Sequence, residues 1–539
     1  MGSFFASSRQ LVLPCLFLFK LFLMRLLIAA LFSLFLSLGF WSCSVPQAVA
    51  PAPSAPVEFI VLQLNDVYEI APLEGGTAGG LARVATVRQE LLRENPNVIT
   101  VMAGDFLSPS FLGTMSYTND AGERERIAGL QMVETLNAMG LDYATFGNHE
   151  FDLKDLALLE KRMDQSTFRY TVCNALAVTE GGNARPFAQN GQAVPEYLVH
   201  EVAAADGRKL RVGIVGVVLP FNKADYVRYA DATDAFRKTL PQVEAASDLV
   251  LAITHQSVEE DEALAAAVPG VPLFIGGHEH AKLSRYVDQT AITKADANAK
   301  TVYIHRISYD PVSRRSVLSS TLRKIDQNIA DEPGTKAVVD KWVNQVFSLM
   351  EDMGYDPTKE VLQLTEPLVC KEELIRTSAT NYGQLTMEAI AKALPGADLY
   401  VLNSGSMRLD DNLFNIVTEY DVLRTFPYGG NFVTLQMPGS AVTQLLQTGL
   451  KTNYGDGGYL QQRNADPETF ALSGQAIDPT KTYSVVMPEF MAQGKEANLD
   501  FLKGYYQGNP AKTLTVGTQT LRNDLRDIVI YHMQELGTY

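Results

Sequence analysis

The sequence predicts an α/β fold in two domains, and three observations support this. From Val57 to about Asp326, short β-rich runs alternate with segments of helical period, which favours helices packed on buried sheets. The chain has 539 residues, which is too long for a single hydrophobic core. A second series of strand-like and helix-like segments begins near residue 360. We therefore expect two α/β domains in succession.

The expected strands of the first domain are short runs rich in β-branched and other apolar residues. They lie at 57–64, 97–103, 141–147, 211–219, 247–254, 271–277 and 301–309. Segments 79–95 and 128–140 repeat apolar residues with helical period and are expected to be helices between the strands. We place this domain at residues 57–330.

The second half begins after an amphipathic helix expected at 335–354, which is long enough to bridge two domains. The next expected elements share the same strand and helix patterns. They are strands at 360–368, 397–403, 432–437 and 482–487, and a helix at 381–394. We place the interdomain helix and linker at 331–358 and the second domain at 359–539.

Residues 1–50 are expected to be a targeting segment. Arg25 precedes an uncharged apolar stretch, Leu26–Trp41, which is shorter than a comfortable membrane span. The Pro/Ala-rich stretch 46–56 offers small residues for cleavage and a spacer. Met1 and Met24 are alternative starts, and an uncleaved N-terminal anchor is the alternative to a signal peptide. Either case predicts a protein of the periplasm, the cell envelope or the secreted fraction.

The net charge and the cysteine count limit which partners and which kinds of site are expected. The formal net charge of −16 argues against nucleic-acid polymers and anionic membranes as main partners, so membrane contact is expected only through an uncleaved anchor. A small anionic substrate remains compatible with this charge. Cys15 and Cys43 lie in or near the signal, which leaves only Cys173 and Cys370, too few for a disulfide framework or a thiolate metal cluster.

Polar side chains follow five of the expected strands of the first domain. The candidates are Asp66, Asp105, Asn148, His255, His278 and His280. Sites assemble at the carboxyl ends of strands in α/β folds, and carboxylate, amide and imidazole groups together suit Zn, Mn, Fe or Co. Six candidates exceed the needs of one tetrahedral ion, so we expect two divalent ions that share a bridging carboxylate. In an extended backbone, His278 and His280 would point the same way.

The order of these motifs carries a family resemblance. "ND", "GDF", "GNHEFD", "TH" and "GHEH" resemble the calcineurin-type metallophosphoesterase signature, and "NYGQLTMEAIAKAL", "ADLYVLNSGSMR", "FPYGGN" and "PEFMAQG" are similar to the C-terminal domain of secreted 5′-nucleotidases. The resemblance implies a β-sandwich flanked by helices, a bridging helix, and a second α/β domain that binds substrate.

The resemblance also implies roles for the first-domain residues. Asp105 would bridge both metals. Asn148, His255 and His278 would complete one metal site, and Asp66 and His280 would belong to the other. His149 would face the phosphate, and Asp152 would orient its imidazole and favour the protonated form.

In the second domain, the resemblance implies a nucleoside pocket. Arg408 is similar to a family arginine that contacts the phosphate or carboxylate side of the substrate. Phe490 and Tyr428 would stack on the base, and Asn431 would bond to its edge. Glu496 stands where the family carries an aspartate in a Gly-Gly-Asp-Gly-Tyr run, so the pocket is expected to be altered.

Tyr68 is a departure, because the family has a histidine two residues after the aspartate. If the chain stays extended, Asp66 and Tyr68 both face the site. Three states remain open for the phenol: it coordinates as phenolate, it hydrogen-bonds a water on the metal, or it only packs. A phenol that does not coordinate implies a weaker ion at the Asp66/His280 site.

The sequence thus predicts an exported dinuclear metal-dependent phosphohydrolase that acts on nucleotides or related phosphate esters. One alternative is a cyclic phosphodiester or sulfur-compound hydrolase on the same scaffold. Another is a non-catalytic nucleotide-binding protein of the envelope. The presence of both His149 and Asp152 argues against the second alternative, since binding alone gives no physical reason to keep them.

Overall fold

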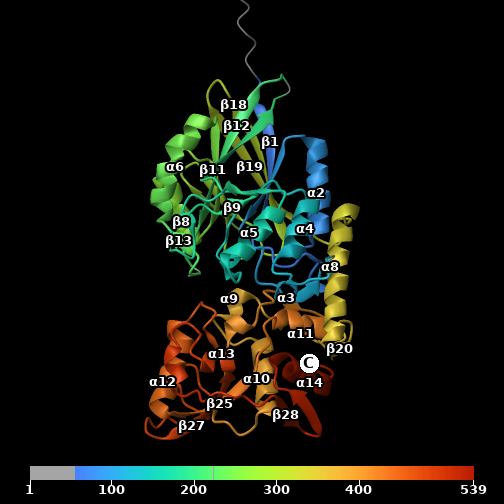
Figure 1. Cartoon of the computed structure of the whole chain (residues 1–539), viewed down its shortest axis with the longest axis vertical. Helices are drawn as coiled ribbons and strands as arrows, with labels where there is room; N and C mark the ends of the chain where they lie inside the picture. Colours follow the sequence, from blue (N-terminus) through green and yellow to red (C-terminus); the bar gives the residue numbers. More distant parts are fainter. Residues whose placement is uncertain (1–54, 120, 205, 222–223) are drawn as a thin grey trace, which may run out of the picture. The chain divides into compact units, whose positions relative to one another are not determined.

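A computed structural model describes residues 55–539, except 120, 205 and 222–223. The targeting segment expected at 1–50 therefore lies outside the described residues. Among the helices that the structure does describe, none combines the length and apolar character needed to cross a membrane. The chain folds as an α/β protein, as expected (Figure 1).

Six strands form the first sheet, in the order β19-β18-β1-β2-β5-β6. Their bounds are Arg315–Lys324, Thr301–Asp310, Val57–Leu64, Val98–Ala103, Tyr143–Thr145 and Arg169–Tyr170, in that order. Strands β1, β2, β5 and β6 run parallel to one another, whereas β18 pairs antiparallel with both β1 and β19. The carboxyl ends of β1, β2 and β5 therefore lie at one edge of the sheet.

A second six-stranded sheet has the order β11-β12-β14-β15-β17-β16. Its strands span Tyr197–Ala203, Lys209–Val218, Leu249–His255, Leu273–Gly277, Thr290–Lys294 and Leu283–Val287, in that order. Strands β12, β14, β15 and β17 are parallel, so β14 and β15 also end side by side.

The two sheets pack face to face, which confirms the expected β-sandwich. Side chains of both sheets share one buried cluster, in which Phe59 and Val61 of β1 meet Ile214 of β12 and Leu251 of β14. The alternate residues of β1, such as Leu62, face a different cluster beneath the helices. Burial on both faces explains why β1 reads as a continuous apolar run.

Helices cover the outer faces of both sheets. Those beside the first sheet are α2 (Leu81–Glu94), α4 (Leu130–Met139), α5 (Leu156–Gln165) and α8 (Pro333–Asp352), and those beside the second are α6 (Ala232–Ala246) and α7 (Val258–Ala267). Helix α8 matches the expected bridging helix. Its Trp342 is buried, and Nε1 of Trp342 donates a hydrogen bond to Oε2 of Glu134 on α4 at 2.8 Å.

The second half contains a four-stranded sheet in the order β25-β27-β22-β26. These strands span Phe432–Pro438, Thr482–Pro488, Leu399–Asn403 and Leu460–Arg463, and the longer helices are α10 (Asn381–Ala393), α11 (Glu419–Thr425), α12 (Gly439–Gln447) and α14 (Leu525–Leu536). A separate apolar cluster lies between the sheet and α12. The two-domain α/β architecture is thus as predicted, while the boundaries at residues 330 and 358 remain predictions.

Short elements connect these layers. The short helices are α3 (Phe111–Thr114), α9 (Glu372–Ile375) and α13 (Glu489–Ala492), with 3-10 turns at Glu74–Gly76, His149–Asp152, Ser404–Ser406 and Asp500–Gly504 and a π-helical turn at Thr448–Thr452. The short strands are Ser116–Thr118, Arg124–Arg126, Ala175–Val178, Ala184–Arg185, Ala188–Gln189, Gln192–Ala193, Val227–Tyr229, Glu360–Gln363, Leu368–Val369, Asn412–Leu413, Ile416–Thr418, Thr513–Val516 and Gln519–Arg522.

Candidate functional site

Side chains from the ends of β1, β2 and β14 converge at one place. One ligand atom each of Asp66, Asp105 and His255 lies within 4.8 Å of the other two, and all three side chains are buried. Two of these residues follow strands of the first sheet and one ends a strand of the second. The site is therefore built at the carboxyl edge that both layers of the sandwich share.

Glycines allow the loops of this edge to approach closely. A Cβ atom on Gly147 would lie 2.1 Å from Oδ1 of Asp105, and one on Gly277 would lie 2.4 Å from the carbonyl oxygen of Ala103. Real Cβ atoms do not come that close. Any side chain at these positions would push the polar groups apart.

Asp105 is contacted by three groups from different segments of the chain. Its Oδ1 accepts a hydrogen bond from the backbone N–H of His149 at 2.7 Å, and its Oδ2 lies 3.1 Å from the hydroxyl of Tyr68 and 3.2 Å from Nε2 of His255. Burial by itself raises the pKa of Asp105. The charges of His255 and His149 lower it by a larger amount, so the pKa of Asp105 is well below its usual range. The group is an anion between several donors.

Glu150 holds the loops after β2 and β5 together. Its Oε2 accepts the backbone N–H groups of Asp105 and Gly147 at 2.8 and 2.6 Å, and its Oε1 accepts those of Phe106 and Leu107 at 2.7 and 2.9 Å. Burial and the charge of Asp105 raise the pKa of Glu150 to about 7. Glu150 lies within the motif "GNHEFD", but only the folded structure shows that it joins the two loops.

Two buried atoms show that the site fits a cation. Nδ1 of His255 lies 2.7 Å from the carbonyl oxygen of Ala103 and must donate to it, because a carbonyl only accepts. Nε2 of His255 and Oδ1 of Asn148 are buried without a hydrogen-bond partner. Burial lowers the pKa of His255, but Asp105 and Asp66 raise it to about 9. The negative charges of Asp105 and Asp66 that favour a proton on His255 also favour a metal ion beside it.

Asp66 faces two groups from the "GHEH" segment. Its Oδ2 accepts the backbone N–H of His278 at 2.9 Å, and its Oδ1 lies 3.4 Å from Nε2 of His280. The backbone here is not extended, since φ is +93° at His278 and +55° at His280. The expectation that the two rings point the same way because of an extended backbone is therefore wrong. His278 lies beside His255, with ring centroids 5.5 Å apart, while His280 turns toward Asp66 and Tyr68.

Tyr68 does face the site, although for a different reason than expected. Asp66 has a φ of +52°, so the chain turns after β1 instead of staying extended. The hydroxyl of Tyr68 lies 2.9 Å from Nε2 of His280 and 3.1 Å from Oδ2 of Asp105. Burial, and then the charges of Asp105 and Asp66, raise the pKa of Tyr68 well above its usual value. The described structure thus holds a neutral phenol among the candidate ligands.

His149 and Asp152 form a close pair in the turn after β5. Nδ1 of His149 lies 2.5 Å from Oδ2 of Asp152, so the carboxylate fixes the ring orientation. Burial lowers the pKa of His149, but Asp105 and Asp152 raise it above its usual value. This arrangement favours an imidazole that carries a proton.

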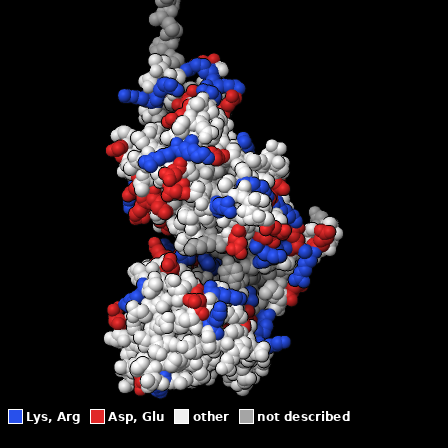
Figure 2. Space-filling view, turned by 60° about the vertical axis from the view of Figure 1, so that its left-hand side comes forward, with Lys and Arg blue, Asp and Glu red and all other residues white. Residues whose placement is uncertain are grey.

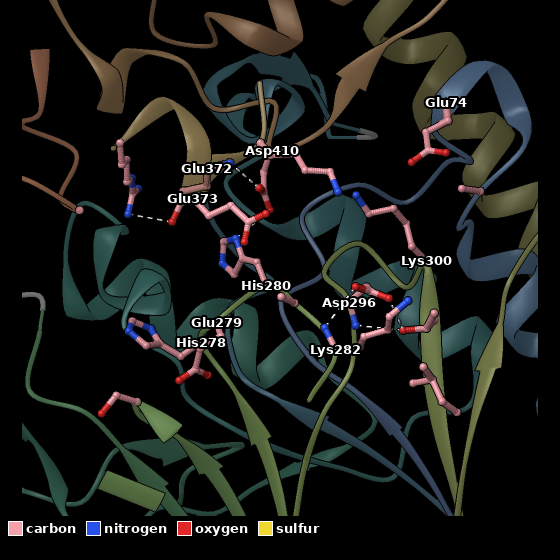
Figure 3. A pocket seen from close by; sticks show the side chains of 18 of the residues that line it. Glu74, His278, Glu279, His280, Lys282, Asp296, Lys300, Glu372, Glu373 and Asp410 are labelled. Atoms are coloured by element: carbon pink, nitrogen blue, oxygen red, sulfur yellow. Dashed lines mark hydrogen bonds and ion pairs between the residues drawn. The ribbon is translucent and has the colours of Figure 1, made fainter. Parts of the chain in front are cut away.

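A cavity of about 720 Å³ adjoins the acids and imidazoles. It is lined by His278 and His280 from the first half and by Glu372 and Asp410 from the second (Figure 3). Arg376 of the second half also lines it. Nδ1 of His280 lies 2.7 Å from Oδ2 of Asp410. Residues of both halves therefore face the same space.

The predicted nucleoside-pocket residues come together in part. Phe490 and Tyr428 expose 47% and 55% of their surface, so both rings are open to a ligand. Nδ2 of Asn431 donates to Oε2 of Glu489, which precedes Phe490, at 3.2 Å. Tyr428 lines a pocket of about 80 Å³ together with Asp152 and another of about 720 Å³ together with Arg526, and it does not line the cavity around His280.

Arg408 and Glu496 complete the predicted set. Nε of Arg408 is buried without a hydrogen-bond partner, and although burial lowers the pKa of Arg408, Tyr428, Glu372 and Asp152 raise it. Oε2 of Glu496 accepts a hydrogen bond from Nδ2 of Asn403 at 2.6 Å. The guanidinium thus lies among acids of both halves.

Several polar residues of the site were not found by sequence reasoning. They are Glu150, Glu372, Arg376, Asn403 and Asp410. Glu150 lies in the motif "GNHEFD" and Asn403 in "ADLYVLNSGSMR", so the family motifs are the signal that points to these two residues. Glu372, Arg376 and Asp410 lie in segments without a local signal, and only the fold brings them to the cavity.

Comparisons with known proteins agree with this geometry. Residues 59–282 match the family described as calcineurin-like phosphoesterase, and residues 361–503 match the 5′-nucleotidase C-terminal domain. A snake venom 5′-nucleotidase from Gloydius brevicauda is 22% identical over 532 residues, which cover 86% of this chain and 85% of the relative.

Two solved structures share the fold. A 5′-nucleotidase precursor from Thermus thermophilus has a TM-score of 0.68 at 18% identity and covers 89% of this chain and 97% of its own. A sulfate thiohydrolase from the same organism, solved with glycerol, has a TM-score of 0.62 at 14% identity and covers 89% and 94%. At these identities the likeness describes the fold alone.

Proposed function

This chain belongs to the 5′-nucleotidase family, with a calcineurin-like phosphoesterase domain followed by a 5′-nucleotidase C-terminal domain, and we propose that it is an exported, dinuclear metal-dependent phosphohydrolase acting on nucleotides or related phosphate esters. It is a hydrolase of small phosphate esters by its family. The number and identity of the ions, the substrate and the export are the proposal.

The buried, unpartnered Nε2 of His255 and Oδ1 of Asn148 are the observation that carries this proposal. Nε2 of His255 lies 3.2 Å from Oδ2 of Asp105, and leaving buried polar atoms without a hydrogen bond costs about 1–3 kcal/mol each. A divalent ion removes that cost. Asn148, His255 and His278 would hold one ion, Asp66 and His280 the other, and Asp105 both.

The donor set suits Zn, Mn, Fe or Co. Such ions, when bound, supply positive charge that neutralises a phosphate ester and makes water more acidic. The carboxylates and imidazoles of this chain hold that charge in place. A phosphate ester binds here despite the net charge of −16, because the local charge decides the contact.

His149 and Asp152 act on the substrate side. The pair holds a proton on the imidazole, which donates it to the leaving oxygen or stabilises the charge that develops there. Arg408 adds a second cation on the side of the C-terminal half, where it faces the phosphate side of the substrate. Phe490 and Tyr428 stack on the base, and Asn431 and Glu496 contact its polar edge.

A phosphate-release screen tests the function. Metal-stripped protein is supplied with Mn, Zn, Co or Mg and assayed on nucleotides, cyclic nucleotides, sugar phosphates and a thiosulfate ester. We expect nucleotide monophosphates to release phosphate in at least one metal. Hydrolysis of only a cyclic nucleotide, measured by its monophosphate product, or of only the sulfur ester, measured by released sulfate, would replace the proposal with the alternative hydrolase. If the protein binds nucleotides but hydrolyses none of the substrates with any of the four metals, the proposal would be replaced by a non-catalytic nucleotide-binding protein.

Two variants separate catalysis from metal binding in the same assay. His149→Ala should keep its metal content but lose about 10²-fold or more in turnover, since one transition-state contact is removed. Asp105→Ala should lose metal as well as turnover. Near-normal turnover in His149→Ala, or two retained ions in Asp105→Ala, would contradict the assigned roles.

The export proposal has its own measurement. It rests on Arg25 and the apolar stretch Leu26–Trp41, which lie outside the described residues. The N-terminus of the protein isolated from its own cells should begin after residue 41, in an envelope or external fraction. A protein that begins at Met1 or Met24 in the cytosolic fraction would contradict export.

A further inference from the structure

His280 is contacted from both halves of the chain. Its Nε2 faces Asp66 and Tyr68 of the phosphoesterase half, while its Nδ1 lies 2.7 Å from Oδ2 of Asp410. Figure 3 shows the ring of His280 and the carboxylate of Asp410 facing each other from different segments of the chain. Only 11% and 12% of these two side chains are exposed, so the contact is largely shielded from water.

Asp410 is itself held in place. Its Oδ1 accepts the backbone N–H of Glu372 at 2.9 Å, and its backbone adopts a φ of +46°, which is uncommon for a residue other than glycine. One oxygen of the carboxylate is thus bound to the backbone of α9, and the other is directed at the imidazole. This geometry differs from that of a mobile surface ion pair.

The contact selects the form of the imidazole. A carboxylate only accepts hydrogen bonds, so Nδ1 of His280 carries a hydrogen, and Nε2 is the ring atom left to offer a lone pair to an ion. Oδ1 of Asp66 lies 3.4 Å from Nε2. Two electron-rich atoms at this distance require a cation or a proton between them. A second partner of this kind orients a metal-binding histidine and makes it a stronger ligand.

We propose that Asp410 is a positioning residue for the ion site that Asp66 and His280 form, so that the affinity of one ion depends on a residue of the C-terminal half. This inference rests on the metal-dependent function proposed above. Linkage makes the dependence reciprocal: an ion at that site strengthens the contact between His280 and Asp410 by the same free energy. The substrate-binding half and the metal centre are thereby coupled before any substrate arrives.

The neighbouring residue offers a matched control. Oδ1 of Asp411 lies 3.5 Å from Nζ of Lys300, so Asp411 also joins the two halves, but through a lysine and not through a candidate metal ligand. If Asp410 acted only by holding the halves together, Asp411→Asn would reproduce its effect. If Asp410 acts through the imidazole, Asp411→Asn leaves the ion affinities unchanged.

Calorimetric titration of Mn²⁺ into the metal-stripped full-length chain is the test. We expect Asp410→Ala to weaken one ion by about 10–100-fold and to leave the other unchanged, with Asp410→Asn in between. Asp411→Asn should match the wild type. His280→Ala identifies the affected site, and Asp410→Ala added to His280→Ala should cause no further loss.

Unchanged ion affinities in Asp410→Ala would overturn the proposal. So would an Asp411→Asn variant that weakens ion binding as much as Asp410→Ala does, or an Asp410→Ala variant that weakens both ions equally. A further loss in the double variant would also overturn it. Long-range ¹H–¹⁵N spectra of ¹⁵N-histidine protein provide a second readout, because the chain has only 7 histidines. The metal-free wild type should show the ring of His280 protonated at Nδ1, as the contacts of His149 and His255 also require for those rings, and only the His280 signature should be lost in Asp410→Ala; no such change would refute the assignment of the Nδ1 hydrogen. Neither measurement uses turnover, so a failure of the positioning role of Asp410 can be distinguished from a failure of the proposed function in the nucleotide screen.

Discussion

At the scale of single residues, Tyr68 stands where the family that the sequence resembles has a histidine. Its hydroxyl lies within hydrogen-bond distance of both Asp105 and His280, the residues proposed to hold the second ion. A phenol that stays neutral is a poor ligand, since deprotonation at neutral pH costs about 1.4 kcal/mol per pKa unit. We therefore propose an asymmetric centre with a firm Asn148/His255/His278 site and a weaker Asp66/His280 site.

Tyr68→His should tighten the weaker ion, because an imidazole replaces a neutral phenol. Metal titration of the stripped wild type should show two unequal affinities, and the variant should bring them closer together. Tyr68→Phe is the control, since it keeps the ring and removes the oxygen. Two equal affinities that Tyr68→His leaves unchanged would contradict the asymmetric centre. A visible band of the iron-loaded protein that disappears in Tyr68→Phe would establish direct phenolate ligation instead.

His305 has a purely structural place, which makes its pH dependence easy to predict. It is fully buried, with Nε2 at 2.9 Å from Oε1 of Gln63 and Nδ1 at 2.8 Å from Oγ of Ser320. Burial lowers the pKa of His305 to about 3. Below its unfolded pKa of about 6.5 the unfolded chain binds a proton that the folded chain does not, so stability falls as pH decreases through this window.

The variant His305→Gln should remove that part of the pH dependence while keeping a neutral hydrogen-bonding side chain. The free energy of unfolding of the wild type, relative to the variant, should fall by roughly 2 kcal/mol between about pH 7.5 and pH 5. Urea unfolding of both proteins at the two pH values measures this difference. A constant difference would show that His305 is protonated in the folded protein.

At the scale of elements, the site depends on how closely the loops after the strands approach one another. The loops after β2 and β5 are joined by the four backbone hydrogen bonds to Glu150 and by the glycines at their tips. The loop after β15 is held by Lys294, which forms an ion pair with Glu279 of that loop. Nζ of Lys294 also lies 3.0 Å from Oδ2 of Asp261 on α7. These contacts place polar groups where an isolated loop would not hold them.

Gly147→Ala should disrupt this arrangement, because its Cβ would fall 2.1 Å from Oδ1 and 2.5 Å from the backbone nitrogen of Asp105. We expect a destabilisation of about 1–3 kcal/mol, typical of overpacking, together with weaker metal binding. Thermal unfolding and metal titration measure the two effects.

Gly181→Ala is the matched control. Its added Cβ would meet nothing closer than Nδ2 of Asn183 at 3.6 Å, which is an ordinary contact. This variant should stay within about 0.5 kcal/mol of the wild type and keep its metal affinity. A normal metal affinity in Gly147→Ala would show that the loop relaxes without moving Asp105.

At the scale of the whole molecule, the proposed function assigns metal binding to the first half of the chain and substrate recognition to the second. Lys, Arg, Asp and Glu are interspersed on the face drawn in Figure 2, so no single-sign surface steers a large charged partner there. Recognition is instead local. The cavity beside His280 is lined from both halves, and the exposed aromatic rings belong to the second.

Phe490→Ala should separate the two tasks. Loss of a stacking ring costs about 1–3 kcal/mol per base, so KM for a nucleotide should rise by roughly 5- to 150-fold. KM and kcat for a simple aryl phosphate, which has no base, should remain near the wild type. Steady-state kinetics on both substrates measure the effect.

Tyr286→Ala controls for the loss of an exposed aromatic ring, since Tyr286 is 68% exposed on β16 and does not line the cavity. It should leave both substrates unaffected. A Phe490→Ala enzyme that loses aryl phosphate and nucleotide turnover equally would contradict the division of work between the halves.

The sequence by itself determined the elements and the chemistry of their ends. Strand β1 and helices α2, α8 and α10 were predicted within a few residues, because burial leaves a period of 2 or 3.6 in the local sequence. The motifs also placed Asp66, Asp105 and His255 in one cluster, because parallel strands end at a common edge. Their roles as metal ligands remain predictions.

Only the tertiary structure decided which way the side chains turn and what meets them from afar. The positive φ angles of Asp66, His278 and His280 break the extended backbone that spacing alone suggests. His280 and Asp410 are 130 residues apart, and nothing in "RLDDN" signals an imidazole partner. Local periodicity records which face of an element is buried. It carries no record of which distant segment covers that face, and the contact between His280 and Asp410 is of this long-range kind.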